Sequence, residues 1–71
     1  MTQVSSGQIQ KLYDYIVEFL MKHSYPPSVR EMTNYMGFRT TSTTQYYLDR
    51  METAGLIQHE PGKARTVVPL A

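Results

Sequence analysis

The sequence predicts a mainly α-helical fold of three helices followed by a C-terminal two-stranded β-hairpin. Three observations support it: two stretches with apolar residues at helical spacing, a short helix between clear start and stop signals, and a β-branched tail interrupted by a proline–glycine turn. The chain has 71 residues, 41% hydrophobic and 18% charged, a balance typical of one small globular unit. We therefore expect residues 1–71 to form a single domain with a small core.

The first helix is expected over about residues 7–23. Its apolar residues recur at the i, i+3, i+4, i+7 spacing of one helix face: Ile9, Leu12, Tyr13, Ile16, Phe19 and Leu20. Ser6 is the expected N-cap, and His23 lies near the C-terminal end, where the helix dipole favours positive charge. The pair Pro26-Pro27 disfavours helix at the residue before it and predicts an extended connector.

A capping box predicts where the second helix begins. Ser28 is followed three residues later by Glu31, so each side chain can accept a hydrogen bond from the other residue's backbone N–H. Gly37 is placed to end the helix in a left-handed conformation. The second helix is therefore expected over about residues 29–36, with a buried stripe made of Val29, Met32 and Met36.

A run of five hydroxyl residues, from Thr40 to Thr44, precedes the third helical pattern. Threonine is β-branched and a mediocre helix former, so this run alone would indicate loop or strand. The residues that follow recur at helical spacing ahead of Gly55: Tyr47, Leu48, Met51 and Ala54. Because a threonine or serine cap before the periodic part costs a helix little, we expect the third helix over about residues 41–54.

The tail predicts a hairpin, called the wing below, over about residues 56–69. Residues 56–59 are short and β-compatible, residues 60–63 form a turn with proline and glycine at its centre, and residues 64–68 are β-branched and extended. Pro69 cannot donate to a ladder and marks an edge or an end. Because such a hairpin is marginal alone, it must pack on the helices, and the residues expected in the core are Leu12, Ile16, Leu20, Met32, Met36, Phe38, Leu48, Met51 and Ile57.

Two helices joined by a short glycine-containing turn, after a first helix and before a hairpin, describe a three-helix winged helix-turn-helix. In that motif the second helix of the pair enters the major groove of DNA with its N-terminal residues towards the base edges. The residues from Thr41 to Tyr46 all carry hydrogen-bonding groups, and Gln45 can pair with adenine. On the wing, Lys63 and Arg65 can reach a backbone phosphate or the minor groove. The pattern predicts double-stranded DNA as the partner.

Net charge does not support this prediction. Seven basic and six acidic residues leave a formal charge of +1, whereas nucleic-acid-binding domains usually have a clear basic excess. A polar helix start and a loop with lysine and arginine are also ordinary features of a solvated surface. The alternative is a winged-helix module that binds other proteins and not DNA.

Catalysis, metal binding and membrane insertion are not expected. The chain has no cysteine and two histidines, His23 and His59, whereas a catalytic metal site usually has three protein ligands. Ser24 beside His23 lacks the third group that would orient a nucleophile–base pair. Because no apolar run could span a membrane and no signal peptide is visible, we expect a cytoplasmic protein without a cofactor.

Three segments in register carry a resemblance to a known family. Tyr25–Glu31 resembles the family's Pro-Pro-(Thr/Ser)-x-x-Glu segment, and Met36–Thr40 resembles its Leu-Gly-Phe-x-Ser turn. Leu48–Ile57 resembles its Leu-x-x-Leu-x-x-x-Gly-hydrophobic-Ile segment, and the resemblance runs from about Ser6 to Arg65. The family is the N-terminal DNA-binding domain of LexA, the repressor of the bacterial SOS response.

The resemblance implies sequence-specific DNA binding by a transcriptional regulator, with the third helix in the major groove and the wing at the backbone or minor groove. Motif and resemblance together give these candidate DNA contacts: Arg39, Thr40, Thr41, Ser42, Thr43, Gln45, Tyr46, Lys63 and Arg65. The family's recognition helix starts with asparagine, then alanines, then acidic residues, where this chain has Ser42–Tyr46. We therefore expect a target that differs from the SOS operator.

Repressors of this family continue into a serine–lysine self-cleaving and dimerising domain, whereas this chain ends at Ala71. The expectation is an excised domain or a small stand-alone regulator, bacterial or from a phage, without enzymatic activity. It is expected to act as a weakly binding monomer, or as a dimer on an operator with two half-sites.

Overall fold

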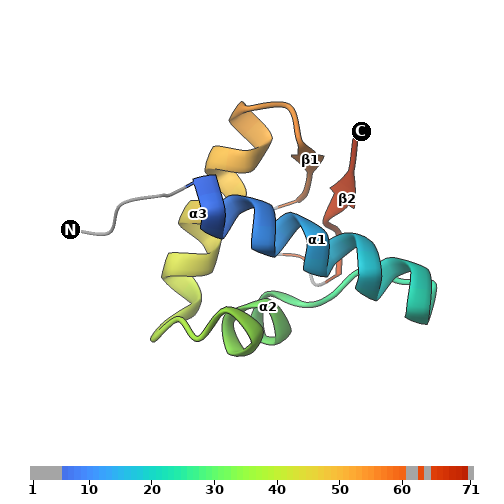
Figure 1. The fold of residues 1–71 in the computed structure, drawn as a ribbon, viewed down its shortest axis with the longest axis horizontal. Helices are drawn as coiled ribbons and strands as arrows, with labels where there is room; N and C mark the ends of the chain where they lie inside the picture. The colour runs from blue at the N-terminus through green and yellow to red at the C-terminus, as the bar shows by residue number, and fades with distance from the viewer. Residues whose placement is uncertain (1–5, 61–62, 64, 71) are drawn as a thin grey trace.

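The computed structural model of the protein describes residues 6–60, 63 and 65–70. Within these residues α1 (Ser6–His23), α2 (Val29–Met36) and α3 (Thr41–Thr53) are followed by the strands β1 (Ile57–Gln58) and β2 (Val68–Pro69). In Figure 1, α1 lies across the view, with α2 below it and the two strands above it. α3 lies beside the first turns of α1. The three helices and the antiparallel pair of strands confirm the predicted winged helix-turn-helix.

The first helix differs from the expectation at its start. Ser6 is the first helical residue and not the N-cap before the helix, and the residue preceding it lies outside the described residues. The first N–H groups of a helix have no intrahelical partner in any case, so one more residue can join it without losing a bond. At the other end the N–H of Ser24, at φ 66°, donates to the Leu20 carbonyl (2.8 Å) and closes α1 before the prolines.

The local signals in the sequence set both ends of α2. The N–H of Ser28 donates to Glu31 Oε1 (2.8 Å), and the N–H of Glu31 donates to Ser28 Oγ (3.1 Å), which completes the capping box. At the other end Gly37 has φ 75°, and its N–H donates to the carbonyls of Thr33 and Asn34. A residue with a Cβ is strained in this left-handed conformation, so glycine allows the tight turn into α3.

The wing has less strand than expected. Ile57 pairs with Pro69 and Gln58 with Val68, and next to these pairs the Leu70 N–H donates to the Leu56 carbonyl (3.0 Å). The extended segment expected over residues 64–68 is wrong at Arg65, whose φ is 55°. The reason lies at the base of the loop, where the Thr66 hydroxyl bonds the N–H (2.9 Å) and the carbonyl (3.2 Å) of Glu60 in place of a ladder. Ala64 and the expected proline–glycine turn at 61–62 lie outside the described residues.

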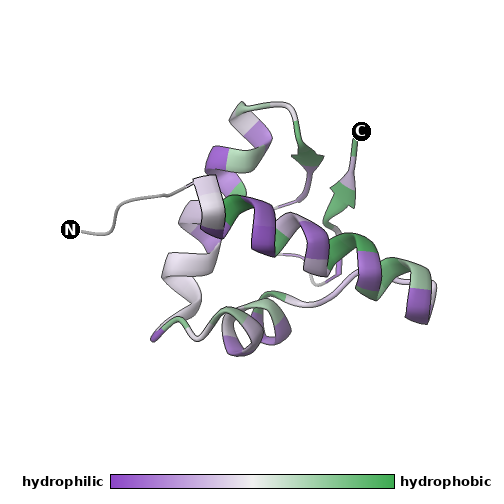
Figure 2. Ribbon diagram, viewed as in Figure 1, coloured by the Kyte–Doolittle hydropathy of each residue, from purple (hydrophilic) through white to green (hydrophobic). Residues whose placement is uncertain are grey.

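One apolar cluster fills the space between the helices and the wing. Its buried members are Leu12, Ile16, Met32, Met36, Tyr47, Leu48, Met51, Ile57 and Val67. Two of the residues expected there are only partly buried: Leu20 lies one turn beyond Ile16, the last member from α1, and Phe38 lies in the turn, with its ring 4.9 Å from that of Tyr47. In Figure 2 hydrophobic and hydrophilic bands alternate along α1, both strands carry hydrophobic colour, and the first turns of α3 are pale.

The described helices include none that is both long enough and apolar enough to cross a membrane.

Candidate nucleic-acid interface

The N-terminal half of α3 has a polar outer face without charge. Thr41, Ser42 and Tyr46 are exposed, and Thr43 and Gln45 are partly buried. The opposite face is buried against the core and consists of Thr44, Tyr47, Leu48 and Met51. The division follows from the helical repeat, since residues three and four apart share a face. The outer face therefore presents hydroxyl, amide and phenol groups.

The turn before α3 continues this surface. Arg39 and Thr40 are both exposed. Thr40 is the N-cap, in an extended conformation (φ −138°, ψ 158°), and its side chain makes no capping hydrogen bond to any described residue. Its hydroxyl and the first N–H groups of α3 can therefore bond an outside acceptor such as a phosphate oxygen.

The two basic residues of the wing have different surroundings. Lys63 Nζ lies 3.3 Å from Glu60 Oε2, with both side chains well exposed (72% and 65%). An exposed pair of this kind is worth little, so the ammonium group can exchange the carboxylate for another anion. Arg65 Nη1, by contrast, donates to Glu31 Oε1 (2.9 Å) and to the Pro26 carbonyl (3.1 Å).

The guanidinium of Arg65 also lies over the ring of Tyr25, with 4.7 Å between Cζ and the ring centroid. Its contacts join the wing to the segment that begins α2. Both hydrogen bonds use Nη1, and the side chain is 40% exposed, so part of the guanidinium still faces solvent.

Gln45 lies next to the wing. Its side chain lines a small cavity of about 20 Å³ together with Lys63 and Arg65, and the same cavity is lined by Pro27 of the connector. The structure thus brings the predicted base-reading glutamine and the two basic wing residues to one place. Arg39 and Thr40 are at the turn before α3 and are not among the residues that line this cavity.

Glu31 is charged at this junction. The backbone N–H of Ser28 and then the guanidinium of Arg65 hold the pKa of Glu31 below its ordinary value, because both favour the ionised carboxyl. Burial, with a contribution from the Glu31 charge, raises the pKa of the Tyr15 hydroxyl. The Glu31 carboxylate therefore caps α2 and pairs with Arg65 of the wing.

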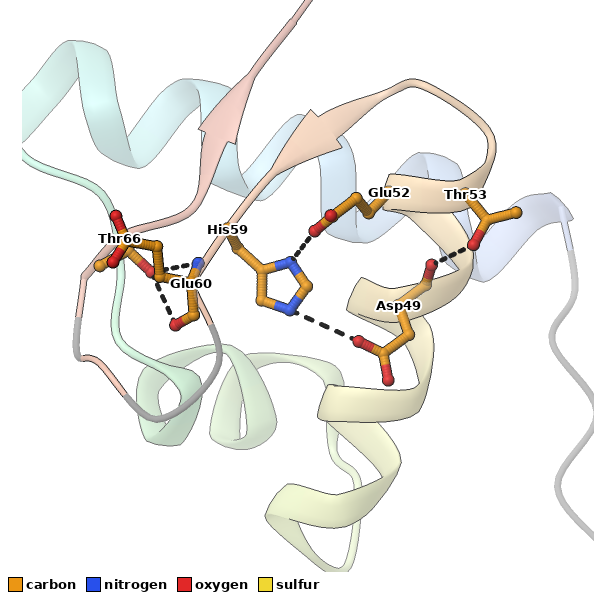
Figure 3. A network of polar contacts seen from close by, with 6 residues as sticks. All are labelled: Asp49, Glu52, Thr53, His59, Glu60 and Thr66. Atoms are coloured by element: carbon orange, nitrogen blue, oxygen red, sulfur yellow. Dashed lines mark hydrogen bonds and ion pairs between the residues drawn. The ribbon is translucent and has the colours of Figure 1, made fainter.

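A second contact joins the wing to the C-terminal half of α3. Figure 3 shows the imidazole of His59 between the carboxylates of Asp49 and Glu52. His59 Nδ1 lies 2.6 Å from Glu52 Oε1, Nε2 lies 3.5 Å from Asp49 Oδ1, and the His59 side chain is only 6% exposed. Neither ring nitrogen makes a hydrogen bond of acceptable geometry, so the contacts are close approaches of the ring to the two carboxylates.

The two acidic side chains also limit the interface. Asp49 and Glu52 are 67% and 46% exposed and would repel a phosphate backbone. The part of α3 that suits DNA is therefore its first half, ahead of Asp49. No group of three His, Cys, Asp or Glu side chains that could hold a metal ion occurs in the part of the chain that the structure describes.

The similarity to known proteins agrees with this geometry. Residues 1–66 match the family model of the LexA DNA-binding domain. The chain belongs to the LexA DNA-binding domain family. It is 47% identical over 58 residues to the LexA repressor of Acetivibrio thermocellus, a match that covers 82% of this chain and 27% of the relative.

Other LexA repressors align over more of the chain. That of Exiguobacterium sibiricum is 42% identical over 67 residues (94% of this chain, 32% of the relative), and that of Syntrophomonas wolfei is 38% identical over 69 residues (96% and 34%). The chain spans 27% to 34% of the length of these relatives. The matched LexA domain is a DNA-binding one and not a catalytic one. Membership confirms the family that the sequence resembled. It also favours DNA binding over the protein-interaction alternative.

Two contacts between the wing and the helices of this LexA domain have no signal in the sequence. The pair Glu31–Arg65 joins residues 34 positions apart, and the contacts of His59 cross from β1's end to α3. Only the capping motif pointed to Glu31, and nothing in the strand-like segment around His59 indicated a contact with Asp49 or Glu52. Each depends on how the wing packs on the helices.

Proposed function

We propose that the chain binds double-stranded DNA sequence-specifically as the DNA-binding domain of a transcriptional repressor. The first half of α3 enters the major groove, and the wing lies against the backbone or the minor groove. The observation that carries the proposal is the position of Gln45, beside Lys63 and Arg65 and on a helix face without acidic side chains before Asp49. One surface then combines groups that bond base edges with groups that bond phosphates.

The proposed contacts divide by chemistry. Hydroxyl and amide groups on α3 read base edges, with threonine methyl groups against thymine and the Gln45 amide on adenine. The backbone contacts come from the turn and the wing, where part of the Arg65 guanidinium faces solvent beside its bonds to Glu31 and Pro26. The full proposed set is Arg39, Thr40, Thr41, Ser42, Thr43, Gln45, Tyr46, Lys63 and Arg65.

The action of the whole protein is part of the proposal. We propose that residues 1–71 form one domain and act in the cytoplasm, where bacterial DNA is found. Repression is supported by the relatives, which are LexA repressors. Two copies on an operator with two half-sites would supply the affinity that one recognition helix lacks.

The test begins with selection of a duplex from a randomised pool by the protein itself. Dissociation constants are then measured by fluorescence anisotropy, at several salt concentrations, for the selected duplex and for a random duplex of equal length. We expect at least about a hundredfold preference for the selected duplex, since each good base contact contributes about 1–3 kcal/mol. Equal, salt-insensitive binding to both would favour the protein-interaction module instead.

A further inference from the structure

Two buried threonine hydroxyls join the helices of the helix-turn-helix. Thr33 of α2 is 6% exposed and Thr44 of α3 is 0% exposed, and their Oγ1 atoms lie 2.6 Å apart. Thr33 Oγ1 also lies 2.7 Å from the carbonyl of Val29, one turn earlier in α2. Both threonines are buried as whole residues, beside an otherwise apolar cluster of buried residues.

The hydrogen count decides the direction of these bonds. A threonine hydroxyl carries one hydrogen and can accept through its oxygen. The Val29 carbonyl can only accept, so Thr33 donates to it. Thr33 can then only accept from Thr44, which gives a chain from the Thr44 O–H through Thr33 to the Val29 carbonyl. We call it the hydroxyl relay.

The hydroxyl relay differs in kind from the apolar contacts between the two helices. Apolar burial is non-directional and tolerates a small slide or rotation of one helix on another. A hydrogen bond weakens steeply with distance and angle, and a buried hydroxyl that loses its partner is left unsatisfied. The relay therefore favours one rotation of α3 on α2.

Thr44 lies where such a constraint affects the proposed base contacts. It immediately precedes Gln45, and Thr41 lies one turn earlier in α3. Because these residues belong to one helix, with about 1.5 Å of rise and about 100° of rotation between neighbours, their side chains move together with it. A small slide or rotation of α3 on α2 therefore carries them away from the base edges. We propose that the hydroxyl relay is a positioning element that sets the aim of α3 and through it the sequence selectivity, an inference that rests on the proposed function.

Three variants separate positioning from packing. Thr33→Val with Thr44→Val removes both hydroxyls at nearly constant volume, and Thr33→Ser with Thr44→Ser keeps the hydroxyls without the methyl groups. The matched control is Thr53→Val, because Thr53 is also in α3 and donates to a backbone carbonyl, that of Asp49 (2.9 Å), but it is exposed. The probes are the duplex selected from a random pool by the unmodified protein and a random duplex of equal length.

The readout is the ratio of the two dissociation constants. For the valine pair we expect selectivity to fall about tenfold, as for one misaligned base contact, while affinity for the random duplex and its salt dependence stay unchanged. The serine pair and Thr53→Val should keep the parent ratio. If the valine pair does not fold, Thr44→Val serves instead, since it removes the bond between the helices and leaves Thr33 bonded to Val29.

Urea unfolding tests the direction of the relay without DNA. Thr33→Val leaves the buried Thr44 O–H without its acceptor, whereas Thr44→Val leaves Thr33 still donating to the Val29 carbonyl. The Thr33→Val variant should therefore unfold at a lower urea concentration than Thr44→Val, and the reverse order would overturn the assigned direction.

The outcomes also separate the two proposals. If the parent protein prefers no duplex, the proposed function fails and the role in selectivity fails with it, while the urea order still tests the relay. If the parent is selective and the folded valine pair keeps the full ratio, the hydroxyl relay is structural only and the inference is overturned.

Discussion

At the scale of single residues, the guanidinium of Arg65 joins parts of the chain that lie 34 and 39 positions away, at Glu31 and the Pro26 carbonyl. The left-handed backbone of Arg65 (φ 55°) turns the chain at this position. Such a conformation costs a non-glycine residue about 1–2 kcal/mol. The ion pair, the hydrogen bond and the contact with the Tyr25 ring offset part of that strain.

Replacing this arginine tests its proposed contact with DNA. Arg65→Ala should weaken binding to all duplexes about equally and lower the salt slope by roughly one unit, because one phosphate contact is lost. Anisotropy titrations of the selected and random duplexes across a salt series measure both quantities. Weaker binding with an unchanged slope would mean that Arg65 acts only by holding the wing.

Glu31 makes stability depend on pH. Its pKa is lower in the folded protein than its ordinary value of 4.5, first because of the Ser28 N–H and also because of Arg65. The contribution of the ionised Glu31 carboxylate to the free energy of unfolding is thus complete above about pH 4.5. It declines below that pH, where the unfolded chain takes up a proton before the folded protein does, and it is lost once the pH falls through the folded pKa.

Glu31→Gln should therefore be less stable than the parent at pH 7, and the difference should shrink on acidification below about pH 4.5. Urea unfolding of both proteins from pH 7 to pH 3 gives the difference directly. A gap that stays constant over this range would show that the carboxylate charge contributes nothing to stability.

Replacing Gln45 tests whether its amide contacts a base edge. Gln45→Ala should weaken binding to the selected duplex by about 1–3 kcal/mol and leave binding to random duplex nearly unchanged, because an amide contact to a base edge is lost while phosphate contacts remain. The matched control is Gln58→Ala, since Gln58 is an exposed glutamine on β1. An equal loss on both duplexes would assign Gln45 to the backbone instead.

At the scale of elements, the turn between α2 and α3 depends on one backbone conformation. Gly37→Ala should destabilise the protein by about 1–2 kcal/mol, because a Cβ at φ 75° is strained even though nothing lies within 4 Å of it. The control is Gly7→Ala in α1, where a Cβ also meets nothing within 4 Å. There the change should stabilise the helix by up to about 1 kcal/mol.

Chemical denaturation of the two alanine variants gives the comparison. Opposite signs are expected from the same substitution, since only one of the glycines has a positive φ. Equal effects would mean that the left-handed turn is not what ends α2.

α3 shows how tertiary contacts override local preference. Its start is rich in threonine, which is a mediocre helix former, yet the helix begins at Thr41. Burial of Tyr47, Leu48 and Met51 favours the helix, and Thr44 satisfies its hydroxyl on Thr33 inside the cluster. The element is stabilised by its packed face more than by its propensity.

At the scale of the whole molecule, the wing is held at two points. Arg65 joins it to the start of α2, and His59 joins it to the second half of α3. Strands of two residues each are too short to be stable alone. The position of Lys63 relative to α3 therefore depends on contacts made outside the hairpin.

A single copy should bind DNA weakly. One recognition helix and one wing offer few phosphate contacts, so we expect affinity to fall with salt along a slope that corresponds to only a few phosphates. Sedimentation equilibrium gives the oligomeric state, and anisotropy gives the affinity at physiological salt. Nanomolar binding by a strict monomer would contradict the expectation.

The sequence was sufficient to predict the elements because their signals are local. A capping box, a helical repeat and a stop glycine act through hydrogen bonds and side chains within about four positions of one another. The capping box of Ser28 and the left-handed Gly37 occur where these signals predicted. The candidate DNA surface on α3 was also readable, since the helical repeat separates its polar and buried faces.

Only the tertiary structure decided which distant groups meet. Three contacts join separate elements: Arg65 with Glu31, His59 with the carboxylates of α3, and Thr33 with Thr44. The left-handed turn at Arg65 likewise had no signal in the sequence. Such contacts follow from how the helices and wing pack, and packing depends on the shape of the whole core and not on any local stretch. The sequence alone thus determined the helices, the presence of a wing and the family. Packing decided the shape of the wing and how it and α3 are held for their proposed contact with DNA.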